Sequence, residues 1–255
     1  MPKKAQVTAF IIVGVSFVLA MVFIFFLRNS IIEAVKGEAG TRAILNNFAN
    51  SIENKIYDCL KEEGELSLEL LGRKGGYFEP PKVYKYNGED FTYLCEKEHT
   101  DDGVACINHI PSISFMEKEV KDYLLPRIGD CIGIEDLKQR GTTISYQTPP
   151  SLEVEIKREN VVLKMDYKIE LERRNITQSV PVVVVELDIP LGKIMDVVND
   201  VMDEECVIGD FDPTVYFFAH QKRYEVIKMH YPGAKLYKVK SFDNLKYKFQ
   251  FAVGP

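Results

Sequence analysis

The first apolar block of the chain is a run of 21 residues without a charge, at residues 7–27. A helix of that length spans about 30 Å, which is the thickness of the hydrocarbon core of a bilayer. Soluble helices usually keep a polar face, whereas this run is apolar around its whole circumference. The pattern therefore predicts an N-terminal transmembrane helix at residues 7–27, with the lipid bilayer as its partner.

After the apolar run the pattern changes to that of an amphipathic helix. Large apolar side chains recur at spacings of three and four with polar residues between them, namely Ile44, Leu45, Phe48, Ile52, Ile56 and Leu60. Gly37 and Gly40 predict a break between this helix and the membrane helix, and Gly75-Gly76 predicts its end. We therefore expect residues 30–76 to form a helical stalk.

Residues 77–255 have the pattern of a mixed head. Asn87 begins an Asn-Gly turn, which predicts a hairpin inside a loop-rich segment, and Met116 begins a second amphipathic helix that Pro126 is expected to kink or split. Alternation of apolar and polar residues from Leu152, with turns after it, predicts a three-stranded antiparallel meander at 152–156, 161–171 and 180–189. A helix at 191–206 and four further short strands near 214–219, 223–229, 234–240 and 246–253 are expected after it. The expected fold class is α+β: an N-terminal transmembrane helix, an amphipathic helical stalk, and a head of antiparallel strands with two further helices.

Charges on the two flanks of the apolar run indicate its orientation. Lys3 and Lys4 precede the run, and basic residues near a span favour the cytoplasmic side, although Arg28 behind it weakens that bias. No small-residue cleavage site follows the run, which argues against a cleaved secretory signal. We expect a single-pass cell-membrane protein in which residues 1–29 form a cytoplasmic head and anchor and residues 77–255 form an extracytoplasmic head.

The start of the chain resembles the archaeal class III, or prepilin-type, signal. Lys3-Lys4-Ala5-Gln6 stands directly before the apolar helix, and in that family a basic head is cut just before the helix, commonly ahead of Gln. The resemblance implies cleavage between Ala5 and Gln6 and packing of the helix into a filament core. Two positions depart from the pattern, because Ala5 stands where Gly is usual and Phe10 stands where many pilins carry Glu. The alternative is an uncut anchor.

The layout of the chain also resembles uncharacterised single-span exported proteins of small-genome archaea. The shared motifs are Gln-Val-Thr-x-Phe-Ile-Ile at residues 6–12, a Cys-Leu helix at residues 59–60, Leu-Gly-x-x-Gly-Gly-Tyr at residues 71–77, and a final aromatic-x-Phe-x-Phe-Ala strand at residues 247–252. None of these motifs carries chemistry. The resemblance therefore implies a location and no activity.

The charge of the chain beyond the anchor is acidic. All 38 acidic residues and 29 of the 32 basic residues follow Arg28, so this part carries a formal net charge of −9. Such a charge argues against nucleic acid and anionic lipid as partners, and it is also an ordinary means of staying soluble. The partners that remain are the bilayer and either another protein or a second copy of the chain.

The five cysteines are compatible with two disulfides and one spare thiol. Cys95 and Cys106 bracket a polar stretch, and closing that loop is worth roughly 2–3 kcal/mol, so this is the first expected pair. Cys59 and Cys131 form the second expected pair, because each lies in an apolar helical pattern. Sequence alone does not determine pairing, and reduced buried thiols are the alternative. No Cys-x-x-Cys is present, which argues against a zinc knuckle or a thioredoxin-type site.

No nucleophile, metal or cofactor motif is present, so we predict a non-enzymatic protein without a cofactor. His220 and His230 are expected on adjacent strands but lack a third ligand. The acidic residues near 200–212 do not follow the order of a calcium loop, and Asp210 and Asp212 are read as turn formers. Asn175 begins a glycosylation sequon in a predicted turn.

These observations leave three hypotheses about function. The first is a membrane-anchored, extracytoplasmic cell-envelope protein with a surface or interaction role. The second is a type IV pilin-like subunit processed after Ala5. The third is a membrane-tethered hydrolase whose site combines His220 with Asp210 or Asp212.

Overall fold

A computed structural model describes the backbone of residues 3–100, 103–137, 139–207, 209–220, 223–242, 244 and 246–254. Within these ranges, side chains are described except at residues 3–14, 25–36, 98–100, 103–105 and 207. The fold is α+β, as predicted. The helices are α1 (Lys3–Arg73), α2 (Ile113–Ile132), the 3-10 helix η1 (Ile134–Asp136), α3 (Leu191–Val207) and α4 (Pro213–Ala219).

The strands form three sheets. The six-stranded sheet has the order β1 (Val83–Tyr86), β2 (Glu89–Thr100), β12 (Lys248–Val253), β11 (Ala234–Ser241), β10 (Tyr224–Tyr231), and β3 (Gly103–Asn108) also pairs with β2. One three-stranded sheet has the order β5 (Ser151–Ile156), β6 (Val161–Asp166), β9 (Val183–Leu187). The other has the order β4 (Thr143–Ser145), β7 (Glu170–Arg173), β8 (Ile176–Ser179).

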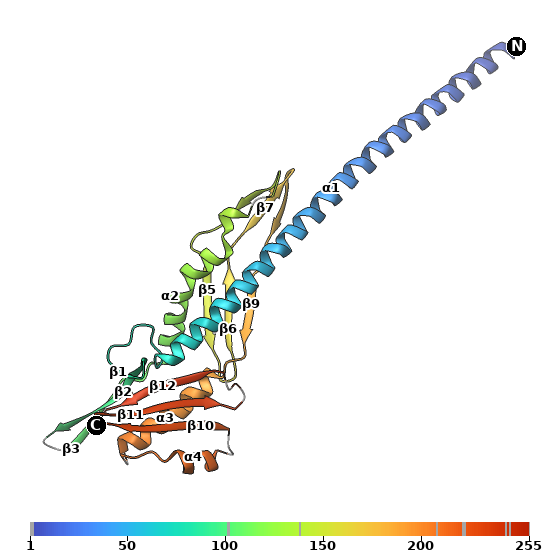
Figure 1. Cartoon of the computed structure of the whole chain (residues 1–255). Helices are drawn as coiled ribbons and strands as arrows, with labels where there is room; N and C mark the ends of the chain where they lie inside the picture. The colour runs from blue at the N-terminus through green and yellow to red at the C-terminus, as the bar shows by residue number, and fades with distance from the viewer. Residues whose placement is uncertain are drawn as a thin grey trace.

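Helix α1 is continuous over 71 residues, and its N-terminal half stands clear of the head (Figure 1). The predicted break at Gly37 and Gly40 is wrong. A glycine inside a helix costs about 1 kcal/mol, which the flanking residues of a long helix outweigh. The predicted end is confirmed, since α1 stops at Arg73 and the backbone of Gly75 and Gly76 turns with φ of +64° and +89°.

The C-terminal half of α1 packs against α2 and the sheet β5-β6-β9 (Figure 1). Four residues of its predicted apolar stripe, Leu45, Ile52, Ile56 and Leu60, are at most 1% exposed, whereas Phe48 is half-buried and Ile44 is exposed. The stripe of α2 is buried in the same way from Met116 to Ile132. Pro126 lies inside α2 without splitting it. Both helices thus lie on one side of a common core.

Two predicted strands of this region are shorter than expected. The segment 161–171 divides into β6 and β7, and the segment 180–189 contains only β9. Between them, β7 and β8 form a hairpin that joins a different sheet through β4. The turn of this hairpin is the predicted one, with Arg174 and Asn175 at φ of +51° and +60°.

The six-stranded sheet is mainly antiparallel, but its C-terminal strand β12 pairs in parallel with β2. Helix α3 packs against β11 and β2, and α4 packs against β10. The hairpin at Asn87-Gly88 is confirmed, while the segment 77–112 is less loop-rich than expected because it contains three strands.

The predicted strand 214–219 is wrong, because these residues form α4. The Asp212 carboxylate accepts hydrogen bonds from the backbone N–H groups of Thr214 and Val215, and Pro213 occupies the first turn. Both features start helices. The described part of the head therefore has three α-helices besides α1, where the sequence predicts two.

A close contact joins the stalk to the six-stranded sheet at Gly72. A Cβ at this position would lie 2.5 Å from the carbonyl oxygen of Lys248 and 2.8 Å from the hydroxyl of Tyr247. Only glycine lets the helix approach the strand so closely. One continuous hydrophobic core runs from α1 and α2 through the sheets to α3.

Candidate functional site

The exposed apolar side chains of α1 form the first candidate site. Eight large apolar residues between 15 and 24 are 47–65% exposed: Val15, Phe17, Val18, Leu19, Met21, Val22, Phe23 and Ile24. Over the residues whose side chains are described, no helix has the length and apolar character needed to cross a membrane. The described side chains do not include those of residues 7–14 and 25–27 of the predicted span. They also do not include Ala5 and Gln6 of the predicted processing site.

A buried carboxylate, Glu205, lies near the end of α3 and is 0% exposed. It accepts hydrogen bonds from the Lys235 ammonium at 2.7 Å, from the backbone N–H of Phe211 at 3.0 Å, and from the Tyr237 hydroxyl. The Lys228 ammonium lies 3.1 Å from the same carboxylate, and its side chain is only 7% exposed. The group therefore ties α3 to β10 and β11.

The pKa of the Glu205 carboxyl reflects two opposed effects. Burial disfavours the charge and raises the pKa, but the hydrogen bonds from Lys235, Phe211, Tyr237 and Lys228 together hold the pKa below 4.5. The exposed neighbour Asp210 has its pKa lowered from 3.8 to about 2, because it accepts hydrogen bonds from Lys228 and Lys235. Burial, followed by the hydrogen bond to Glu205, raises the pKa of Tyr237 above its usual range. With these lowered pKa values, the carboxylates of Glu205 and Asp210 are ionised at neutral pH.

Three cysteine sulfurs meet beside this carboxylate. Cys95 on β2, Cys106 on β3 and Cys206 on α3 place their sulfurs within 4.8 Å of one another. Cys106 lies at bonding distance from both other sulfurs, and the Cys95 and Cys206 sulfurs are 3.4 Å apart. A metal ion needs several His, Cys, Asp or Glu side chains close together. Among the residues that the structure describes, these three cysteines form the one such group.

The expected partner of Cys95 is thus present, but sequence analysis missed Cys206 as a second partner for Cys106. The other expected pair, Cys59 with Cys131, forms a disulfide between α1 and α2 with a Cα–Cα distance of 6.0 Å. Helix α1 is thereby linked covalently to α2 on one side of the core.

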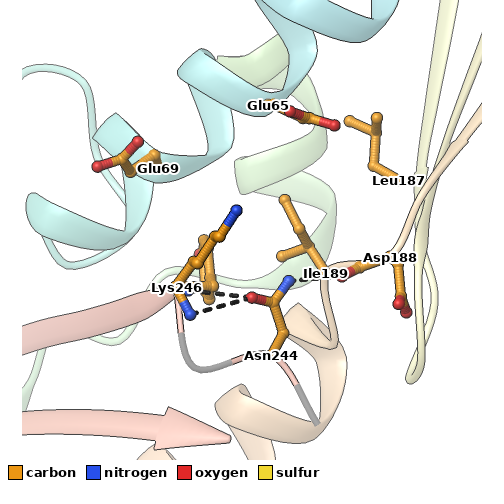
Figure 2. A pocket seen from close by; sticks show the side chains of 8 residues that line it. Glu65, Glu69, Leu187, Asp188, Ile189, Asn244 and Lys246 are labelled. Atoms are coloured by element: carbon orange, nitrogen blue, oxygen red, sulfur yellow. Dashed lines mark hydrogen bonds between the residues drawn. The ribbon is translucent and has the colours of Figure 1, made fainter.

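A cavity of about 300 Å³ lies between α1, the end of β9 and the segment before β12. Figure 2 shows Glu65 and Glu69 of α1 on one side, and Asp188 and Asn244 on the other. The Asn244 side chain donates to the carbonyl oxygen of Asp188 at 2.7 Å and accepts from the backbone N–H groups of Lys246 and Tyr247. These hydrogen bonds join the segment before β12 to the end of β9, on the side of the cavity opposite α1.

The side chains that were expected to form a hydrolase site are not brought together. Asp212 caps α4, and Asp210 pairs with Lys228 and Lys235. His220 is exposed, stacks on Tyr216 at 3.9 Å between ring centroids, and lines a cavity of about 370 Å³ between α3 and α4. Both carboxylates proposed as its partner therefore serve other contacts.

The predicted approach of His220 and His230 across adjacent strands is wrong. His220 follows α4, whereas His230 lies on β10 opposite Lys235. Asn175 is exposed at the tip of the β7-β8 hairpin, where the side chain of the sequon is accessible. The hairpin contacts α1 and lies at the end of the head from which the helix leaves (Figure 1).

No protein-family model, curated protein or solved structure matches this chain. The geometry of the described residues therefore carries the functional argument alone.

Proposed function

We propose that the protein is a membrane-anchored cell-envelope protein that carries its α+β head outside the cell on one long helix. The observation that carries the proposal is the exposed apolar stretch of α1 at residues 15–24. Full burial of a large apolar side chain is worth about 1.5–3 kcal/mol, so covering these eight side chains is worth on the order of 10 kcal/mol.

The distribution of the exposed residues around α1 favours a bilayer as the covering medium. Consecutive helical residues point about 100° apart, so Phe17, Val18 and Leu19 already cover most of the circumference. A single partner helix would cover one face and leave the others in water. Lipid chains cover all faces, and the uncharged run in the sequence has the length to span them.

The head supports a location outside the cytoplasm. Disulfides link its elements, and such bonds persist mainly in oxidising compartments. The non-enzymatic surface role is supported by the contacts of Glu205, Asp210 and Asp212, which are all structural.

Two lysines in the apolar stretch are expected to release the protein from the membrane. Lysine at the centre of a span costs about 3 kcal/mol relative to an apolar residue, so Leu19→Lys with Phe23→Lys costs about 6 kcal/mol. The measurement is extraction of isolated membranes with alkaline carbonate, followed by detection of the full chain in pellet and supernatant.

A matched control places lysines on exposed positions in the C-terminal half of the same helix, which packs on the head. Ile44 and Tyr57 are 38% and 41% exposed, so Ile44→Lys with Tyr57→Lys should leave the chain in the pellet, as in the wild type. Release of the wild-type chain by carbonate would contradict membrane anchoring.

A second candidate function is a pilin-like subunit, which is a membrane protein before assembly. The observation that favours it is the shape of α1: one continuous helix whose N-terminal half stands clear while its C-terminal half packs on an antiparallel sheet (Figure 1). A helix of this kind presents an apolar rod that other copies can surround.

Processing after Ala5 is the test of this second candidate. The intact mass of the chain purified from its native membranes should lack residues 1–5, and the new N-terminus should be Gln6. Replacing both basic residues of the head, with Lys3→Glu and Lys4→Glu, should preserve residues 1–5. A native chain that retains Met1 or loses only Met1 would rule out the pilin-like function and leave the anchor proposal standing.

A further inference from the structure

We propose that Cys95, Cys106 and Cys206 form a thiol–disulfide exchange site. Cys106 changes its partner between Cys95 and Cys206, and Cys206 becomes a modifiable thiol in one of the two states. This inference concerns the head and does not depend on the membrane proposal.

The sulfurs of Cys95, Cys106 and Cys206 all lie within 4.8 Å of one another. Cys106 can therefore pair with Cys95 or with Cys206, but a cysteine sulfur forms only one disulfide at a time. Five cysteines with Cys59–Cys131 paired leave one disulfide and one thiol for the other three. The two bonds of Cys106 are therefore alternative states of one site.

The surroundings allow exchange without rearrangement of the fold. The sulfurs of Cys95 and Cys206 are 3.4 Å apart, so Cys106 changes partner between two adjacent sulfurs. The thiolate is the form of cysteine that attacks a disulfide.

The exchange step is balanced and needs no external oxidant. The Cys206 thiolate attacks the Cys106 sulfur, the Cys106–Cys206 bond forms, and the Cys95–Cys106 bond breaks. The electron pair of the broken bond leaves on Cys95, which takes up a proton from water, while Cys206 has given up its proton. The reverse step regenerates the first state.

The two states differ in the accessibility of the thiol they leave. Cys95 is 0% exposed, so the state with Cys106–Cys206 joined presents no accessible thiol. Cys206 is partly exposed, so the state with Cys95–Cys106 joined presents a thiol to a small disulfide or an electrophile. The exchange also changes which element is covalently linked to β3. The disulfide of Cys106 joins β3 to β2 in one state and to helix α3 in the other.

The test is the time course of N-ethylmaleimide labelling of the native, oxidised full chain. We expect a fast phase from chains that already carry the Cys206 thiol, then a slow phase limited by exchange. The slow phase should be at least about tenfold slower, because the buried Cys95 thiol must first exchange. Labelling should reach one group per chain, all of it on Cys206.

Peptide mapping without reduction completes the test. Acid-quenched, unlabelled protein should contain both the 95–106 and the 106–206 cross-links, and fully labelled protein only the first. Label on Cys95, a labelling level that stops after the fast phase, or a single pairing in the quenched sample would overturn the proposal. The proposal would also be overturned if all three cysteines were reduced and only a bound zinc ion protected them from N-ethylmaleimide.

Single variants test each bond separately. Cys95→Ser should contain only the 106–206 bond and Cys206→Ser only the 95–106 bond, and neither should take up maleimide in the native state. The Cys59–Cys131 cross-link in the same digest shows that the head has folded. A labelled Cys106 in a variant that retains this cross-link would also contradict the proposal, and the wild-type time course remains decisive if a variant misfolds.

Discussion

Glu205→Gln is expected to lower the free energy of unfolding by about 3 kcal/mol or more, because breaking a buried ion pair leaves charge without its partner. The side chain of Lys228 is only 7% exposed. Without the Glu205 carboxylate, its ammonium group would keep the Asp210 carboxylate as a charged partner, and the Asp210 side chain is 71% exposed. Lys235 would lose its 2.7 Å contact in the same way. Urea unfolding of the full chain measures the change.

The same helix offers a matched control for this variant. Asp203 lies two residues before Glu205 and is exposed, so Asp203→Asn should change the free energy of unfolding by no more than about 0.5 kcal/mol. Equal stability of Glu205→Gln and the wild type would show that the buried carboxylate contributes nothing.

The contribution of Glu205 should also depend on pH. Its pKa in the folded protein lies below 4.5, so the unfolded chain binds the proton more readily. The stabilisation is therefore complete above about pH 4.5 and is lost as the pH falls through the lowered pKa. Wild-type stability should decline more steeply over this acid range than that of Glu205→Gln.

Removal of the Cys59–Cys131 disulfide should lower the free energy of unfolding by about 4 kcal/mol in the chain-entropy account, because the bond closes a loop of 72 residues. The variant is Cys59→Ala with Cys131→Ala, which leaves the other three cysteines unchanged. Thermal and urea unfolding should both show the loss.

The residues directly before these cysteines provide the control. Asp58 and Asp130 are both exposed, so Asp58→Ala with Asp130→Ala should cost no more than about 1 kcal/mol. If the cysteine variant is no less stable than this control, the link between α1 and α2 does not stabilise the head.

Local signals in the sequence predict much of the head. The turn at Asn87-Gly88 and the helix end at Gly75-Gly76 follow from residues that tolerate positive φ. The buried stripe of α1 follows from the helical spacing of its apolar residues. In each case the residues that determine the structure are close together in the chain.

A strand prediction failed where a local helix cap competes with strand-favouring residue types. Residues 214–219 have a pattern that suits a strand, yet the cap at Asp212 and the proline after it start helix α4. The helical spacing around Gly37 and Gly40 was likewise a better guide than the glycines, since α1 passes through both.

The amino-acid sequence by itself determined the α+β class, the helical periods, the principal turns and the presence of a charge-free run near the N-terminus. Only the tertiary structure decided that β12 pairs with β2, that Glu205 meets Lys228, Lys235 and Tyr237, and that Cys206 reaches Cys106. Periodicity reports the environment of a residue along its own element and carries no information about which distant element packs against it. Partners in this head lie up to 160 residues apart, as Gln250 of β12 and Asp90 of β2 do, and packing of the whole core brings them together.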